Sequence, residues 1–413
     1  MGKRELGVWM EGVRVATLRS NRPGHIECLY SPEALDSWDL NTPVLSYSLP
    51  LSRKKLQAFA YVTGLLPEGQ HRQQMAALAK VPTVDLLGML ERFGRDVAGA
   101  LVISAEDPPI RNPRVEPYSQ ADLEQAVSDL GGQRPLGLHD DSELSIAGLA
   151  DKMLVVALAD GRYGRPVHGA PSTHILKVDD RVRRGLVRAE HACLLLAQSA
   201  GLRAANSDLV RVGDAECIVV ERFDRTVNEH GDVVRIHQED ACQALGIDPE
   251  RNDRKAKYEA SGGPGFAQVA GVLDAWAEDV EAELLALVDA MVFTVAIGNA
   301  DAHGKNVSFL LPRPGVVGLA PLYDTVPTAV WPTLRTEAGM FVNEVRSLPR
   351  TRFDDLTEEA VRWGLGRRVV RARVSGVLDA LLSSLREGAV EVDTPALEHT
   401  RTRIEGLLHE MTD

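Results

Sequence analysis

The chain has 413 residues, of which 44% are hydrophobic and 25% charged, so it is long enough for two or three domains with real cores. Lysine and arginine total 46 against 59 aspartates and glutamates, and the net charge of −13 argues against nucleic-acid binding over the whole surface. The four cysteines are widely separated, the amino terminus has no apolar signal core, and no apolar run has transmembrane length. These features predict a cytoplasmic protein with reduced thiols and no membrane segment.

The first 106 residues predict a compact α/β domain. Apolar residues that alternate between turn residues indicate strands, and apolar residues spaced three and four apart indicate helices. No catalytic constellation is found in this region. The expected elements are strands over residues 6–10, 13–18, 44–49 and 100–103 and helices over residues 54–66 and 84–93.

The character of the chain changes near residue 144. Residues 107–141 are polar and predict a connector that contains one helix over residues 121–130. The segment Ser145-Ile146-Ala147-Gly148 then precedes a predicted strand over residues 153–159. A turn of small residues beside a strand lets backbone N–H groups approach phosphates, although an ordinary loop accounts for the same pattern.

Two neighbouring segments carry a lysine and a glutamate. Residues 173–177 predict a strand that ends on Lys177, which resembles the strand lysine that contacts nucleotide phosphates in kinases. A lysine that only solvates a sheet edge is the alternative. The helix predicted over residues 189–201 carries Glu190 in its first turn, where the carboxylate either pairs with Lys177 or stabilises the helix dipole.

Residues 217–220 predict a strand that runs into irregular backbone over residues 221–225. Such a segment fits an adenine-binding hinge, because main-chain donors and acceptors recognise adenine, and a simple edge strand is the alternative. Residues 235–240 are expected to open a helix, and the rest of the chain is mainly helical. Four arginines crowd one helical stretch and predict a solvated face, with a patch for an acidic partner or nucleic acid as the alternative. They are Arg367, Arg368, Arg371 and Arg373.

The most informative chemical pattern lies within residues 298–324. Asp301 is followed after four residues by Asn306, which is the catalytic-loop spacing of kinase-type phosphoryl-transfer enzymes. In that arrangement the Asp accepts the proton of the attacking hydroxyl, and the Asn holds a metal ion beside the phosphates. A strand over residues 307–311 and a hairpin return predict that Asp324 is a second metal ligand, and Mg²⁺ prefers such oxygen ligands.

The pattern Asp-x-x-x-x-Asn is short, and taken alone it occurs by chance in many chains. A Walker loop is excluded because one residue too many separates Gly298 from Gly304-Lys305, and Asn306 stands where Ser or Thr must bind Mg²⁺. His303 has no second His or Cys at ligand spacing, so we expect a structural or substrate-orienting histidine. The strand, the hairpin and Asp324 together make the kinase-type loop the favoured interpretation.

Together these segments resemble the HipA family, the serine/threonine protein kinases of bacterial HipA–HipB toxin–antitoxin systems. The resemblance covers nearly the whole chain and depends on several uncommon motifs that occur in the family's order. No single motif would be specific. The motifs lie at residues 94–96, 145–148, 173–177, 221–225, 238–243, 262–265, 298–309 and 321–324.

The resemblance implies an α+β fold in which an amino-terminal α/β domain packs on a two-lobed, protein-kinase-like body. The implied amino-terminal domain covers residues 1–106, and a connector covers residues 107–141. A β-rich ATP-binding lobe with the phosphate loop and hinge would cover residues 142–240. A mainly helical lobe with the catalytic and metal-binding loops would cover residues 241–413.

The resemblance also implies ATP and Mg²⁺ as cofactors and assigns roles to the matching residues. Asp301 would be the catalytic base, and Lys177 would contact the ATP phosphates. Asn306 and Asp324 would bind Mg²⁺. The remaining implied nucleotide contacts are the backbone at Glu221 and Phe223, together with Ser145, Ala147, Gly148, Lys152, Gln238, His303 and Tyr323.

Ser145 matches the serine that family members autophosphorylate, and the added charge would displace the phosphate-binding loop and silence the enzyme. The implied substrate belongs to the translation machinery, notably an aminoacyl-tRNA synthetase, whose modification halts growth. This sequence departs from the family at Ala150, where Gln is usual, and keeps Lys152. The departure concerns loop contacts, since every charged group needed for phosphoryl transfer is present.

Two other functions stay open at this point. One is a kinase that acts on a small molecule or lipid. The other is a kinase-fold corepressor, although a purely structural role gives no reason to keep Lys177, Asp301, Asn306 and Asp324. The resemblance implies a HipB-like DNA-binding antitoxin as partner, with DNA contacted mainly through it, as the net acidity favours.

Overall fold

The computed structural model describes residues 4–130, 151–179, 184–331, 334–388, 390 and 395–411. The chain forms two compact units. Both units combine helices with strands, so the fold is α+β as predicted. Unit 1 consists of Met1–Arg184, Val210–Glu250 and Leu310–Gly315, and unit 2 consists of Gly185–Leu209, Arg251–Phe309 and Val316–Asp413.

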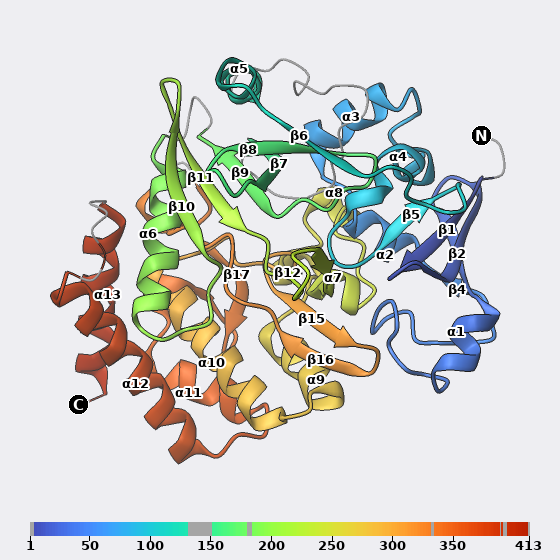
Figure 1. Ribbon diagram of the computed structural model, residues 1–413. Helices are drawn as coiled ribbons and strands as arrows, with labels where there is room; N and C mark the ends of the chain where they lie inside the picture. Colours follow the sequence, from blue (N-terminus) through green and yellow to red (C-terminus); the bar gives the residue numbers. More distant parts are fainter. Residues whose placement is uncertain are drawn as a thin grey trace. The chain divides into compact units, whose positions relative to one another are not determined.

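A five-stranded antiparallel sheet forms the amino-terminal part of unit 1. Its elements are β1 (Arg4–Met10), β2 (Val13–Arg22), β3 (His25–Tyr30), α1 (Pro32–Ser37), β4 (Leu56–Gln57), α2 (Phe59–Gly64), α3 (Gly69–Leu78), α4 (Leu86–Phe93), η1 (Gly94–Asp96) and β5 (Val102–Ser104). The strand order is β4-β3-β2-β1-β5, and α4 packs beside β1 and β5 (Figure 1). Asp85 caps α4, because its Oδ1 accepts the Gly88 N–H at 3.0 Å.

The strand expected over residues 44–49 is wrong, since only an isolated bridge forms there. Its backbone groups bind side chains from a later segment of the chain. The imidazole of His237 donates to the Leu45 carbonyl, and the carboxylate of Glu239 accepts the Tyr47 N–H, each at 2.8 Å. Side chains therefore take the place that a neighbouring strand would occupy.

A six-stranded sheet forms the second part of unit 1. Its elements are β6 (Arg114–Pro117), α5 (Gln120–Leu130), β7 (Asp151–Ala157), β8 (Tyr163–Val167), β9 (His174–Val178), β10 (Ser207–Val212) and β11 (Ala215–Glu221). The order is β10-β11-β9-β7-β8-β6, so β9 is central. The segment predicted as a connector contributes the edge strand β6, which pairs with β8 and was not expected.

The helix expected to open within residues 235–240 is also wrong. Two strands, β13 (Val233–Arg235) and β14 (His237–Asp240), occupy this stretch, and β13 pairs with β12 (Arg225–Val227). Helix α7 (Ala241–Ala244) begins only after them. Its start is fixed by a capping box, in which the Gln243 N–H donates to Asp240 Oδ1 and the Asp240 N–H donates to Gln243 Oε1.

Unit 2 is mainly helical. Its elements, including the hairpin strand that starts in it, are α6 (Leu186–Ser199), α8 (Arg251–Arg254), η2 (Glu259–Ser261), α9 (Phe266–Trp276), α10 (Val280–Ile297), β15 (Ser308–Arg313), β16 (Val316–Leu319), η3 (Thr328–Val330), β17 (Glu337–Val342), β18 (Val345–Ser347), η4 (Leu348–Arg350), α11 (Phe353–Val361), α12 (Arg367–Arg386) and α13 (Pro395–Glu410). Helix α10 is the central one and packs against α9, α12 and α13 (Figure 1). None of the helices in the described part of the chain could cross a bilayer.

Two details of unit 2 bear on the sequence predictions. Helix α6 begins at Leu186, so Glu190 lies beyond the first turn. Of the two roles considered for Glu190, stabilisation of the helix N-terminus is therefore wrong. On α12, arginines pair with acidic residues of other helices, as Arg371 does with Asp354 at 2.6 Å. The pairing supports the predicted solvated face.

Candidate active site

The loop that follows α10 is held by its own backbone and by one threonine. Gly298 ends the helix with a left-handed φ of 72°, and a Cβ at this position would lie 2.8 Å from the Cβ of Ala329. The Ala300 N–H donates to Thr328 Oγ1 at 2.7 Å, and the Thr328 hydroxyl donates to the Gly298 carbonyl at 3.2 Å. The buried helix α10 is therefore followed by a loop of fixed conformation that carries Asp301.

A hydrogen bond joins the two residues of the Asp-x-x-x-x-Asn pattern. Asn306 Nδ2 donates to the Asp301 carbonyl at 2.9 Å, and the Asn306 N–H donates to the His303 carbonyl at 2.8 Å. Because a carbonyl only accepts, this contact fixes the orientation of the side-chain amide. The Oδ1 atom of Asn306 therefore points away from the Asp301 carbonyl and can act as a cation ligand.

The carboxylate of Asp301 is largely withdrawn from water, with 13% of its side chain exposed. The Tyr258 hydroxyl donates to Asp301 Oδ1 at 2.5 Å. Burial raises the pKa of Asp301 to about 6, and the negative charge of Asp324 adds to the rise. The Tyr258 hydrogen bond and the positive charges of Lys257 and Arg335 oppose it. Asp301 thus titrates close to neutral pH, where a general base is effective.

His303 is buried within this loop. Its Nδ1 accepts the Lys305 N–H at 3.3 Å, and its ring packs edge-on against Tyr258 with 4.9 Å between the ring centroids. This pattern places the proton of a neutral ring on Nε2, which lies 3.9 Å from Asp301 Oδ1. These are the contacts of a histidine that supports the loop.

Tyr323 and Asp324 follow the hairpin formed by β15 and β16. The Tyr323 hydroxyl donates to the Lys305 carbonyl at 2.8 Å and lies 2.6 Å from Ser308 Oγ. Asp324 has a φ of 53°, in a region that residues other than glycine rarely adopt and that is enriched at functional sites. The hairpin therefore returns the chain to the loop as the sequence predicted.

Two lysines lie opposite each other in unit 1. Lys177 of β9 is in register with Lys152 of β7 on one side and with Ile218 of β11 on the other. Lys177 is only 5% exposed because β9 is central in the sheet. Directly opposite residues of antiparallel strands share a face, where like charges repel and an anion is stabilised. The pair therefore fits a phosphate chain.

The predicted hinge residues Glu221 and Phe223 flank Arg222 at the end of β11. Strand pairing with β9 continues up to Glu221, and the Arg222 N–H donates to the Thr173 carbonyl at 2.9 Å. Beyond this point the side chain of Arg222 turns into a buried polar cluster. The hinge segment is therefore anchored on its inner side.

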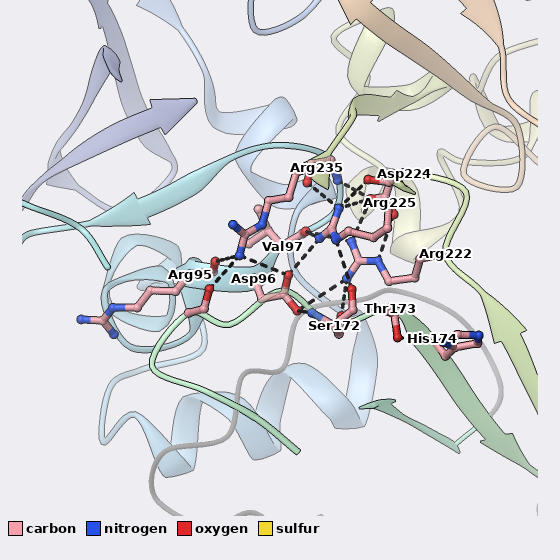
Figure 2. A network of polar contacts seen from close by, with 12 residues as sticks. Arg95, Asp96, Val97, Ser172, Thr173, His174, Arg222, Asp224, Arg225 and Arg235 are labelled. Carbon is pink, nitrogen blue, oxygen red and sulfur yellow. Dashed lines mark hydrogen bonds and ion pairs between the residues drawn. The ribbon is translucent and has the colours of Figure 1, made fainter. Parts of the chain in front are cut away.

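Figure 2 shows this cluster, which we call the arginine–aspartate cluster and which consists of Asp96, Arg222, Asp224, Arg225 and Arg235. Arg222 donates to both carboxylate oxygens of Asp224, at 2.9 and 2.8 Å. Arg225 donates to Asp96 Oδ1 at 2.9 Å. Burial alone would raise the pKa of Asp96, but the three arginines outweigh it and lower that pKa. Each charge in the cluster thus faces an opposite charge.

Backbone groups complete the arginine–aspartate cluster (Figure 2). The Ser172 N–H donates to Asp96 Oδ2 at 3.0 Å, and the Gly99 N–H donates to Asp224 Oδ2 at 2.7 Å. Gln238, predicted to line the nucleotide pocket, donates from Nε2 to Asp224 Oδ2 at 3.2 Å. The motifs at residues 94–96 and 221–225 therefore meet in one cluster, a relation that the sequence analysis missed.

The described site residues fall into two groups, and their roles stay predictions. Unit 2 holds Asp301, His303, Asn306, Tyr323 and Asp324, whereas unit 1 holds Lys152, Lys177, Glu221, Phe223 and Gln238. Ser145, Ala147 and Gly148 lie outside the described residues. Three further residues that act on Asp301 were not predicted from the sequence, namely Lys257, Tyr258 and Arg335. The only signal for the first two was their place just before the motif at residues 262–265.

Comparison with known proteins now assigns the family. A model described as the HipA-like C-terminal domain matches residues 144–385, and a model described as the HipA N-terminal domain matches residues 6–104. The chain belongs to the HipA family. The predicted boundaries at residues 106, 141 and 240 stay predictions, although both HipA models lie within the expected order of domains.

Named relatives of this HipA-family chain include kinases. It is 35% identical to the putative kinase Y4mE of Sinorhizobium fredii, over 92% of this chain and 90% of that protein. It is 27% identical to the serine/threonine-protein kinase toxin HipA of Shewanella oneidensis, over 74% of this chain and 72% of that one. A solved complex of HipA, HipB and operator DNA from Shewanella oneidensis MR-1 has a chain of the same fold, with a TM-score of 0.81, 21% identity and coverage of 98% and 96%. The predicted kinase-like α+β fold is confirmed.

Proposed function

We propose that this chain is an ATP- and Mg²⁺-dependent serine/threonine protein kinase. The observation that carries the proposal is the loop at Asp301, where a poorly solvated carboxylate with a pKa of about 6 is tied to Asn306 and influenced by Asp324. One short stretch thus supplies a proton acceptor and two oxygen ligands. Membership of the HipA family and the named kinases among its relatives support the same function.

The residues around Asp301 fit a divalent cation. Burial is the main cause of the raised pKa of Asp301, and the negative charge of Asp324 raises this pKa further. The two carboxylates therefore repel each other where water is largely excluded. The side-chain oxygens of Asn306 and Asp324 would hold Mg²⁺, which prefers oxygen ligands and keeps several waters. When bound, Mg²⁺ supplies positive charge against the phosphate oxygens.

The paired lysines of unit 1 fit the ATP phosphates. Lys177 and Lys152 stand on one face of the sheet, and both are positively charged. Lys177 would act as the fixed contact because it is buried on a central strand. Backbone groups at Glu221 and Phe223 would hold the adenine, on a segment that the arginine–aspartate cluster keeps in place.

Asp301 would accept the proton of the substrate hydroxyl while that oxygen bonds to the γ-phosphorus of ATP and ADP leaves. Its raised pKa suits this role, because the ionised form is present at neutral pH and is still basic enough to take the proton. Positioning of the two reactants supplies most of the remaining rate enhancement in such reactions.

We further propose that the chain is the toxin of a toxin–antitoxin pair. One relative is named a kinase toxin, and the solved structure of the same fold includes HipB and operator DNA. A HipB-like antitoxin would be the partner, with DNA contacted mainly through it, which suits a net charge of −13. The substrate would belong to the translation machinery, in the class of the aminoacyl-tRNA synthetases, and autophosphorylation of Ser145 would silence the enzyme.

The test is the intact mass of the purified chain after incubation with ATP and Mg²⁺, together with ADP release. We expect one added phosphoryl group that maps to Ser145. Chelation of Mg²⁺ and the Asp324→Asn variant should each prevent the modification. Absence of phosphoryl transfer by the unmodified chain, with or without nucleotide binding, would contradict the proposal.

A further inference from the structure

Tyr258 makes a contact with Asp301 that the proposed reaction does not yet use. Its hydroxyl donates to Asp301 Oδ1 at 2.5 Å, which is a short, charge-assisted hydrogen bond when the carboxylate is ionised. Within the described residues, no hydrogen bond reaches the other oxygen, Oδ2. The two oxygens of the carboxylate are thus distinguished by their surroundings.

Two ring contacts and a neighbouring backbone hydrogen bond hold Tyr258 in place. The guanidinium carbon of Arg335 lies 4.1 Å from the centre of the phenol ring, and His303 packs edge-on against that ring. The backbone beside Tyr258 is fixed as well, because the Gly304 N–H donates to the Lys257 carbonyl at 3.0 Å. A side chain held in this way provides a fixed hydroxyl rather than a mobile one.

Glu259 adds a further anchor to the same segment. Its Oε2 accepts the Phe341 N–H of β17 at 2.6 Å. A Cβ at Gly339, on the same strand, would lie 2.4 Å from the Ala302 carbonyl, so β17 also packs directly against the catalytic loop. Strand β17 therefore contacts both the segment that carries Tyr258 and the loop that carries Asp301, within unit 2.

We propose that Tyr258 is a positioning residue that holds Asp301 through Oδ1 and leaves Oδ2 as the oxygen that accepts the substrate proton. This inference rests on the proposed kinase function, in which Asp301 is the base. A carboxylate held at one oxygen cannot rotate freely about its Cβ–Cγ bond, so its second oxygen keeps a constant direction. The phenol also favours the ionised form, because it donates to a charged acceptor.

A second consequence separates positioning from simple packing. The hydroxyl of Tyr258 binds Asp301, whereas the proposed phosphate contacts, Lys152 and Lys177, lie in unit 1. Tyr258→Phe should therefore lower the turnover number and leave KM for ATP near the wild-type value, whereas loss of packing alone would act through stability.

The experiment measures phosphoryl transfer by the full chain between pH 5 and 9 for wild type, Tyr258→Phe and the control Tyr118→Phe. Tyr118 follows β6 in unit 1 and has no place in the proposed site. We expect kcat of Tyr258→Phe to fall about 10- to 100-fold and KM for ATP to stay near the wild-type value. The control should match wild type.

Urea unfolding of the same variants gives a second readout, and the loss of kcat should exceed any loss of folded protein. If Tyr258→Phe does not fold, Arg335→Lys replaces it, because it keeps the positive charge near Asp301, weakens the contact with the ring and should lower kcat by less. An active wild type whose Tyr258→Phe variant keeps the same kcat, or turns over faster, overturns the positioning role alone. A wild type that binds ATP and transfers no phosphate overturns the proposed function and this inference with it.

Discussion

Each unit of the molecule contains a cluster of carboxylates withdrawn from water, and the two clusters differ in how their negative charge is balanced. In unit 1, Asp96 and Asp224 lie against arginines that donate to them directly. In unit 2, Asp301 receives a neutral phenol hydroxyl and the repulsion of a second carboxylate, Asp324. Direct ion pairs compensate the carboxylates of unit 1, whereas the charges of Lys257 and Arg335 only partly offset the burial of Asp301 in unit 2.

The pKa values follow this difference. Burial alone would raise the pKa of both Asp96 and Asp224, but the arginines reverse the shift, and both values are lowered. Burial also raises the pKa of Asp301, and here the rise prevails, to about 6. A buried carboxylate is therefore kept ionised where arginines bind it directly, and it stays ready to exchange a proton where cations only partly offset its burial.

The largest expected effect comes from replacing the carboxylate of Asp301. Asp301→Asn keeps the size of the side chain and removes the base, so phosphoryl transfer should fall by about a thousandfold or more. The folded-state pKa of Asp301 is raised, so the ionised form destabilises the folded protein above about pH 6. The variant should therefore be at least as stable as wild type at pH 8, as measured by urea unfolding.

The arginine–aspartate cluster should respond in the opposite way. Asp96→Asn leaves three arginines facing a single carboxylate, and removal of one partner from a buried ionic network costs about 3–5 kcal/mol. The pKa of Asp96 is lowered in the folded state, so its contribution is present at neutral pH and is lost as the pH falls through that value. Urea unfolding at pH 7 measures the loss, and an unchanged midpoint would contradict it.

A substitution that leaves the charge unchanged tests whether the conformation of the loop at Asp301 depends on packing as well as on charge. Gly339→Ala places a Cβ 2.4 Å from the Ala302 carbonyl, a backbone atom that must move to make room. Overpacking of this kind costs about 1–3 kcal/mol. We expect lower stability and reduced turnover, whereas Gly376→Ala, on an open face of α12, serves as the control.

The pH dependence of the reaction sharpens the contrast between the clusters. Asp301 must be ionised to accept a proton, so kcat/KM should fall about tenfold for each unit of pH below about 6. The fall should be reversible and occur without unfolding, since the lowered pKa of Asp96 keeps the other cluster ionised there. An acidic limb that coincides with loss of structure would contradict this assignment.

The smallest effect is expected from the exposed ion pairs of α12. Arg371 and Asp354 form such a pair, and both side chains are well exposed. Exposed pairs contribute about 1 kcal/mol or less because water and salt screen them. Arg371→Ala should shift the unfolding midpoint slightly and leave activity unchanged, and a loss comparable to that of Asp96→Asn would contradict the distinction between exposed and buried pairs.

Much of the fold could be predicted because local periodicity is strong in many elements. The strands at residues 6–10 and 173–177 and the helix at residues 84–93 lie close to their expected places. The expectations failed at residues 44–49 and 235–240, two stretches that hydrogen-bond to each other although they are far apart in the sequence. The Tyr47 N–H, for example, binds a carboxylate 192 residues away. Such contacts leave no local pattern.

The same limit separates the predicted from the missed site residues. The sequence allowed three site residues to be proposed, Asp301, Asn306 and Asp324, because one loop and one hairpin bring them together. Their spacing in the sequence indicates that loop and hairpin. Tyr258 lies 43 residues from Asp301, and only packing in unit 2 brings its hydroxyl to the carboxylate. A tyrosine in a sequence gives no sign of which side chain it will bind.

The most direct test measures Asp301→Asn and Asp96→Asn side by side for both unfolding in urea and phosphoryl transfer from ATP, with rates normalised to the folded fraction. We expect Asp301→Asn to be folded and inactive, and Asp96→Asn to be destabilised while its folded fraction stays active. Retained transfer in Asp301→Asn, or equal losses of stability in the two variants, would contradict the division between a reactive carboxylate and a structural one.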